Sequence, residues 1–292
     1  MGFLSALFGG KQLSPEEEKQ EQQQKKFDLL KYDGVKAMKM GQADYAVRCF
    51  EEALKLNDDL EVYDYLSQVL LRLGRLDEAT AQLKVLADAE PENAQIQMRM
   101  AQIAYMQEDY TAMGEAAARA VSLSPDDAHA YYLNAQALMG QQNVVGAIAM
   151  LTKAIALQPD DADAYLLRAQ TLLRMGDTKS ARQDAEWLAE NVGAHEDVLL
   201  LQARIAAAEG QLDEAIATYD KVVEVNPFQI DAFRERGRLK LEQGDKAGAE
   251  QDMQTVLELD PQQLADVSGE YSAEGIEQRV RQAYSAINPL GL

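Results

Sequence analysis

The chain has very few of the residues that commonly carry catalysis. Among its 292 residues there is one cysteine, Cys49, and there are two histidines, His129 and His195. A single cysteine excludes an internal disulfide and fits a reducing compartment. The histidines lie far apart, and no metalloprotease, redox dithiol or hydrolase nucleophile motif occurs. The sequence therefore predicts a protein that is not an enzyme and has no cofactor and no metal site.

One acidic cluster has residues of the kind that bind calcium. Asp160, Asp161 and Asp163 lie together in the sequence, but the sharp-turn glycine and the distal glutamate of an EF-hand loop are missing. Acidic residues in such a position commonly cap the next helix and complement its dipole. We therefore expect helix capping rather than calcium binding.

Basic residues are scarce as well. The chain has 28 lysines and arginines against 49 acidic residues, which gives a net charge of −21. Such a surface repels phosphates, so the composition argues against nucleic-acid binding and disfavours anionic membranes. Two interpretations of the charge stay open: it keeps the protein in solution, or it selects basic partners.

Long hydrophobic runs are absent. The sequence contains no stretch of 18 apolar residues that could span a membrane. Residues 1–13 include Phe3, Leu4, Leu7 and Phe8, but this run is too short for a secretory signal and lacks a cationic start. We expect a cytoplasmic protein whose first residues are flexible or dock on the first repeat. Weak membrane contact by residues 1–10 is an alternative.

Proline is rare but regularly spaced. Of the seven prolines, five fall on one 34-residue grid that a glycine completes: Pro91, Pro125, Pro159, Gly193, Pro227 and Pro261. Self-similarity at a fixed period indicates a stack of one supersecondary unit. Four of the five prolines directly follow long helical patterns, as helix stop signals do.

Each period contains two helical patterns. In the fourth, Tyr131, Asn134, Ala135 and Leu138 lie on one face of a first helix, and Ala147, Leu151 and Ala154 form the stripe of a second. Equivalent positions in all periods form columns. The small residue of the first helix is Gly34, Ser67, Ala101, Ala135, Ala169, Ala203 and Gly237, and the turn residue is Gly41, Gly74, Glu108, Gln142, Gly176, Gly210 and Gly244.

With these columns the chain resembles the tetratricopeptide repeat family. The resemblance implies an all-α, right-handed superhelical solenoid of about seven helix-turn-helix repeats. We predict a short apolar segment over 1–13, an N-terminal helix over 14–26 with a capping box at Ser14 and Glu17, and a capping helix and tail over 264–292. The repeat domain spans 27–263, divided as 27–59, 60–93, 94–127, 128–161, 162–195, 196–229 and 230–263.

The resemblance also implies that the first helices line a concave, peptide-binding groove. The column that faces this groove reads Val35, Gln68, Gln102, Gln136, Gln170, Arg204 and Arg238. Glutamine amides can bond to an extended peptide backbone, and the arginines suit a carboxylate. Plain helix-forming glutamines on a solvated face are the alternative. An apolar strip accompanies the column: Met98, Tyr105, Tyr132, Met139, Leu166 and Leu173.

Three functions follow as hypotheses. The first is a non-enzymatic scaffold or adaptor that binds a peptide segment of a partner protein in the groove. The second is an assembly module, monomeric or homodimeric, that docks through its convex face or a terminal helix. Trp187 is a possible second interface in that case, although it could equally fill local space beside Ala185. The third is a regulatory or membrane-associated assembly factor tethered by residues 1–10.

Overall fold

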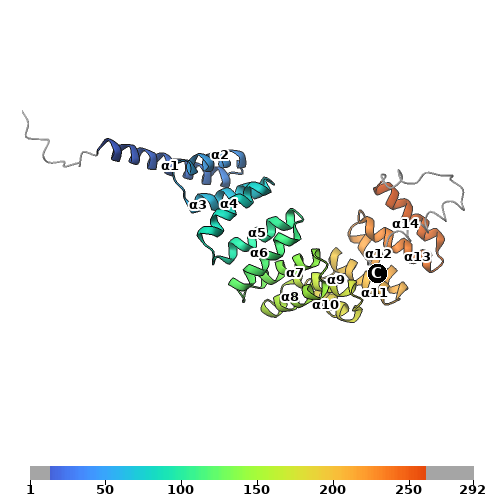
Figure 1. Ribbon diagram of the computed structural model, residues 1–292. Coiled ribbons are helices and arrows are strands. Elements are labelled where there is room, and N and C mark those ends of the chain that lie inside the picture. The colour runs from blue at the N-terminus through green and yellow to red at the C-terminus, as the bar shows by residue number, and fades with distance from the viewer. Residues whose placement is uncertain (1–13, 261–292) are drawn as a thin grey trace, which may run out of the picture. The chain divides into compact units, whose positions relative to one another are not determined.

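The computed structural model describes residues 14–260, which form helices joined by short turns (Figure 1). The segment 1–13 and the capping helix predicted within 264–292 lie outside the described residues. Within 14–260 there are fourteen helices and no strand: α1 (Pro15–Lys39), α2 (Ala43–Leu54), α3 (Leu60–Arg72), α4 (Leu76–Ala89), α5 (Ala94–Met106), α6 (Tyr110–Leu123), α7 (Ala128–Gly140), α8 (Val144–Leu157), α9 (Ala162–Arg174), α10 (Thr178–Asn191), α11 (Glu196–Ala208), α12 (Leu212–Val225), α13 (Ile230–Glu242) and α14 (Lys246–Leu259).

Each odd-numbered helix packs most extensively against the even-numbered helix that follows it. These seven pairs correspond to the seven repeats, so the prediction of an all-α solenoid is confirmed. The chain divides into two compact units, one from Met1 to Pro125 and one from Asp126 to Leu292. The first unit contains α1–α6 and the second contains α7–α14, and each is described by itself.

The second helices stop for the reason that the proline grid suggests. The residue that follows the last helical turn and directly precedes each grid proline has φ between −126° and −133° and ψ between 68° and 95°. This is the extended region to which a following proline restricts a residue. Where glycine replaces proline, Gly193 has φ 96° and its N–H donates to the Leu188 carbonyl at 3.3 Å. A left-handed glycine therefore ends α10 at the same place in the repeat.

The turn inside each repeat keeps one geometry whether or not glycine is present. Five of the seven turn positions are glycines with φ between 71° and 90°. The other two, Glu108 and Gln142, have φ of 57° and 62°. A side chain in this left-handed region is strained by about 1–2 kcal/mol. Repeats three and four thus keep the shared backbone at a local cost.

Nine of the fourteen helices within residues 14–260 begin at a residue whose side chain caps the helix. Ser14 and Glu17 form the capping box, with the Glu17 N–H donating to Ser14 Oγ at 3.2 Å and the Ser14 N–H to Glu17 Oε2 at 2.7 Å. Asp161 accepts the N–H groups of Asp163 and Ala164, at 3.1 and 3.2 Å. The expectation that this acidic cluster caps a helix is confirmed for Asp161.

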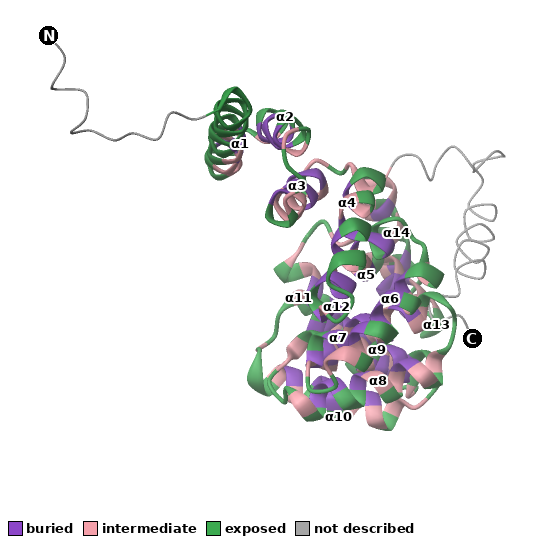
Figure 2. Cartoon of the chain, turned by 60° about the vertical axis from the view of Figure 1, so that its left-hand side comes forward, coloured by how far each residue is buried: buried purple, intermediate pink, exposed green. Residues whose placement is uncertain are grey.

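Small residues allow the two helices of a repeat to approach closely. A Cβ added at Gly34 would lie 2.5 Å from Cε1 of Phe50, so the ring of α2 occupies the space of a side chain on α1. In four other repeats an alanine that is 0% exposed fills this column: Ala101, Ala135, Ala169 and Ala203. The buried residues of each unit form the seam between neighbouring helices (Figure 2).

Candidate peptide-binding surface

The first helices of successive repeats are neighbours within each unit. In the second unit, Thr171 Oγ1 on α9 lies 3.3 Å from Met139 Sδ on α7. In the first unit, Arg99 on α5 pairs with Asp64 on α3 at 2.6 Å. Side chains of neighbouring first helices therefore share one face in each unit, and we call this the first-helix face.

The four glutamines of the predicted groove column divide between the units, two in each. In the first, Gln68 and Gln102 are half-buried, and Gln68 Nε2 donates to Asp64 Oδ2 at 2.9 Å. In the second, half-buried Gln136 donates from Nε2 to the Tyr132 hydroxyl at 3.4 Å, and Gln170 is exposed. A continuous row of four stays a prediction.

The apolar strip is partly accessible and partly buried. Tyr105 is 47% exposed, whereas Met98 and Leu173 are only 3% and 4% exposed. The latter two side chains therefore pack between helices and offer little area to a partner. Tyr132, Met139 and Leu166 are half-buried on α7 and α9. The accessible part of the strip in the second unit consists of these three residues.

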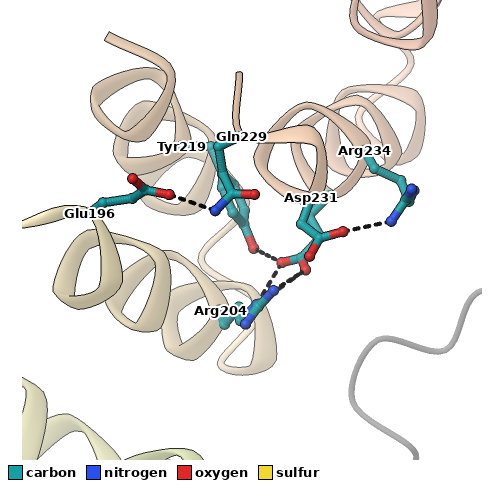
Figure 3. Close-up of polar contacts among 7 residues, drawn as sticks. Glu196, Arg204, Tyr219, Gln229, Asp231 and Arg234 are labelled. Carbon is teal, nitrogen blue, oxygen red and sulfur yellow. Dashed lines mark hydrogen bonds and ion pairs between the residues drawn. The ribbon is translucent and has the colours of Figure 1, made fainter. Parts of the chain in front are cut away.

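The two arginines of the column differ. Arg204 on α11 donates from Nε and Nη2 to the Glu235 carboxylate on α13, with a shortest distance of 2.6 Å, and the Tyr219 hydroxyl donates to the same carboxylate (Figure 3). Its forked pairing with a carboxylate is thus made within the chain. Arg238 is half-buried, and its Nε is buried without a hydrogen-bond partner among residues 14–260.

Burial and charge act together in the Arg204–Tyr219–Glu235 cluster. Burial alone would lower the pKa of the Arg204 guanidinium, but the hydrogen bonds and charge of Glu235 raise it above its ordinary value. Burial raises the pKa of the Tyr219 hydroxyl well above 10, and Glu235 raises it further. The hydroxyl therefore stays protonated and donates to a carboxylate that is already paired with an arginine.

Trp187 packs within its own repeat. Its ring stacks on Tyr165 of α9, with ring centres 3.8 Å apart and planes at 10°. The residue is half-buried in this arrangement. The position matches the local alternative for Trp187, whereas a second interface at this residue stays a prediction.

Sequence reasoning missed two buried ion pairs inside repeats. Arg168 on α9 binds Asp184 on α10 with both guanidinium arms, at 2.7 and 2.8 Å, and Arg236 on α13 binds Asp252 on α14 in the same way. Both pairs are 16 residues apart and occupy the same two columns of repeats five and seven. That joint appearance of arginine and aspartate was the available signal.

Across residues 14–260 no group of three or more histidine, cysteine or acidic side chains could hold a metal ion. No helix in the same range is long and apolar enough to cross a membrane.

A family model described as tetratricopeptide repeat matches residues 34–85, 66–128, 111–162, 132–191, 166–230 and 200–263. These matches together cover well over half of the chain. The chain belongs to the tetratricopeptide repeat family. Proteins of this fold serve in general as scaffolds for protein interaction and are typically non-enzymatic. No curated protein sequence is similar enough to the chain to count as a match.

Several solved structures have the same fold at low identity. A tetratricopeptide repeat protein from Parabacteroides merdae has a TM-score of 0.68 and 17% identity, with 89% of this chain and 99% of that one covered. PilW, described as a type IV pilus biogenesis factor, has a TM-score of 0.64 and 19% identity, covering 75% and 98%. YrrB, described as having an unusual peptide-binding site, has a TM-score of 0.51 and 19% identity, covering 61% and 92%.

Proposed function

We propose that the chain is a non-enzymatic scaffold or adaptor that binds a peptide segment of a partner protein on a first-helix face. The observation that supports this most is the accessible set on α7 and α9 of the second unit. There Tyr132, Gln136 and Leu166 are half-buried, and Gln170 is exposed. Large apolar side chains and amides thus alternate on neighbouring helices. A face that contacts only solvent needs neither kind of side chain.

The chemistry of this set suits an extended or helical peptide. The Tyr132 ring, Met139 and Leu166 offer apolar area, and tyrosine and methionine adapt well to varied partners. The amides of Gln136 and Gln170 can each donate to and accept from a peptide backbone. Arg238, with an unpartnered buried Nε among the described residues, is the arginine suited to an acidic group on the ligand.

Site-specific photocrosslinking tests this proposal. We expect a benzophenone amino acid at Gln170 to form an adduct with a partner protein in cells that express the full chain. The control is the same amino acid at Lys179, an exposed position on α10, the second helix of the same repeat. Adducts at both positions, or at neither, would contradict binding on the first-helix face.

A second candidate, assembly through the open end of the array, rests on α1. In the six later repeats, the residues in the column of Leu29 are buried, each with 4% exposure or less: Val62, Ile96, Ala130, Ala164, Val198 and Ala232. Leu29 itself is 59% exposed and Tyr32, three residues on, is 65% exposed. No earlier repeat covers them among the described residues, so self-association would bury this face. Light scattering of Leu29→Glu against the unchanged chain tests it: a dimer that becomes a monomer supports assembly, and a monomer in both cases excludes it.

A further inference from the structure

A cleft of about 1180 Å³ lies in the first unit between α4, α5 and α6. Its walls are the second helices of repeats two and three, and its floor is the first helix of repeat three. Gln97 and Met100 come from α5, and Ala112 and Ala116 come from α6. These lining residues differ from the groove column, so the cleft is separate from the first-helix face.

The cleft exists because repeat three departs from its neighbours in two columns. Gln97 stands where the other repeats have a large apolar or aromatic residue: Leu30, Tyr63, Tyr131, Tyr165, Leu199 and Phe233. Ala116 stands where the others have a longer side chain: Cys49, Gln82, Met150, Asp184, Thr218 and Asp252. The two changes together remove a ring and the group beside it from the same place.

Later repeats show what normally fills this place. In repeat four, Lys153 lies over the Tyr131 ring, 6.0 Å from its centre. In repeat five, Trp187 stacks on the Tyr165 ring and Arg168 lies 5.5 Å from that ring's centre. Arg119 occupies the column of Lys153 and Trp187 and lines the cleft. Repeat three therefore has the covering group but no ring beneath it.

Gln97 is a polar side chain left in the floor of the cleft. It is only 6% exposed, and it makes no hydrogen bond with the part of the chain that the structure describes. Its amide atoms are not completely enclosed, because within residues 14–260 Arg238 Nε is the one enclosed side-chain N or O atom without a partner. The Gln97 amide therefore reaches the space of the cleft. A ligand group can bond to it there, and a phenol hydroxyl can both donate and accept.

The two ends of the cleft carry opposite charge. At one end Asp77 and Asp109 lie near the starts of α4 and α6, and Gln107 Nε2 donates to Asp77 Oδ1 at 2.7 Å. At the other end are Lys84 and Arg119, and Arg119 donates to the Pro91 carbonyl at 3.0 Å. Lys84 has no ion pair within residues 14–260. Glu115 of α6, which stands between Asp109 and Arg119 along the helix, also lines the cleft. Lys84 is therefore the group left to accept a carboxylate.

We propose that this cleft binds a partner peptide that inserts a tyrosine ring next to an acidic residue. The ring occupies the space that the large apolar or aromatic side chain of this column fills in the other repeats. It enters the cleft from outside, so its hydroxyl reaches the Gln97 amide. The guanidinium of Arg119 lies over the ring, as Lys153 does over Tyr131. The acidic neighbour pairs with Lys84. Binding here adds a second recognition surface to the scaffold.

A titration of the isotopically labelled full chain, followed by amide chemical shifts, tests the proposal. The probe is a short serine–glycine peptide that carries one tyrosine followed by two glutamates. We expect saturable shifts confined to α4, α5 and α6. Peptides with alanine for the tyrosine, or with lysines for the glutamates, should bind about tenfold more weakly or worse. No saturable shift in these helices, or equal affinity of the alanine peptide, would overturn the proposal.

Variants that fill the cleft separate binding from folding. Gln97→Tyr restores the ring, and Ala116→Met copies Met150 of repeat four. Both should keep the helical signal and lower the affinity for the tyrosine peptide about tenfold or more, and Gln97→Tyr should also raise the melting temperature. Thr218→Met, in the same column as Ala116 but in the second unit, should bind like the unchanged chain. Unchanged affinity of Gln97→Tyr would refute the proposal.

The alternative occupant to be tested is the chain's own segment 1–13. A synthetic peptide of residues 1–13 serves as the second probe, and the full chain lacking these residues serves as the second protein. If that peptide displaces the tyrosine peptide and the shortened chain binds the tyrosine peptide more tightly, residues 1–13 occupy the cleft and the assignment to a partner is wrong. No displacement supports the partner peptide.

Discussion

Replacing Glu235 of α13 with leucine removes the carboxylate that binds side chains of α11 and α12. Two groups lose their partner: the Arg204 guanidinium, with 27% of its side chain exposed, and the Tyr219 hydroxyl, in a residue that is 1% exposed. An unsatisfied buried hydroxyl costs about 1–2 kcal/mol. Breaking a fully buried ion pair costs about 3–5 kcal/mol, and the partial exposure of Arg204 reduces this to about 1–2 kcal/mol. We therefore expect Glu235→Leu to lower the free energy of unfolding of the second unit by about 2–4 kcal/mol.

Urea unfolding followed by tryptophan fluorescence measures this directly. Trp187 is the only tryptophan and lies in the second unit, stacked on Tyr165, so its emission reports that unit. The double variant Arg204→Met, Glu235→Leu should recover about 1–2 kcal/mol, because no charge is then left unpaired. The Tyr219 hydroxyl still lacks its partner in the double variant, so the rest of the loss remains. Asp231→Ala is the control, since the Asp231 side chain is 51% exposed and its pair with Arg234 is worth under about 1 kcal/mol. A loss of under about 1 kcal/mol in Glu235→Leu, or a double variant as unstable as the single one, would refute the reasoning.

Three further variants test the turns and the helix end. Glu108→Gly and Gln142→Gly should each stabilise the chain by up to about 1 kcal/mol, because both residues have positive φ, and thermal unfolding by circular dichroism measures it; a loss of stability in both would contradict the assigned backbone. Gly193→Ala should destabilise by about 1–2 kcal/mol in the same assay, because φ there is 96°. An alanine variant as stable as the unchanged chain would mean that α10 does not end on a left-handed residue.

The repeat architecture was predictable because it depends on local periodicity. The 34-residue grid, the small-residue column and the turn column follow from helix packing, which is the same in every repeat. Gly193 shows how robust the pattern is. It replaces a proline and stops the helix by a different backbone conformation at the same residue. Similarly, Glu108 and Gln142 adopt the glycine geometry of the other turns.

The candidate surface was less predictable because side-chain accessibility depends on the neighbouring repeat. Arg204 looks like a groove residue in its own repeat, but Glu235, which lies 31 residues later, neutralises it. Met98 and Leu173 lie in exposed-looking columns and become buried when adjacent helices pack. No single repeat contains this information. It arises only when one repeat is placed on the next, which sequence columns do not specify.

Comparison among the seven repeats gives a way to separate function from folding within one chain. A column that keeps its residue type everywhere, such as the small residue at Ala101, is explained by helix packing. A departure compensated within its repeat, such as the Arg168–Asp184 pair, is explained by local packing as well. Gln97 and Ala116 form the remaining case: two departures that meet in space, leave an amide without a partner in the described chain and open a cleft. Local rules that fail together without internal compensation are expected where a protein binds something else. Repeat three, rather than the Arg204 cluster, is therefore the place where stability is expected to have been exchanged for recognition.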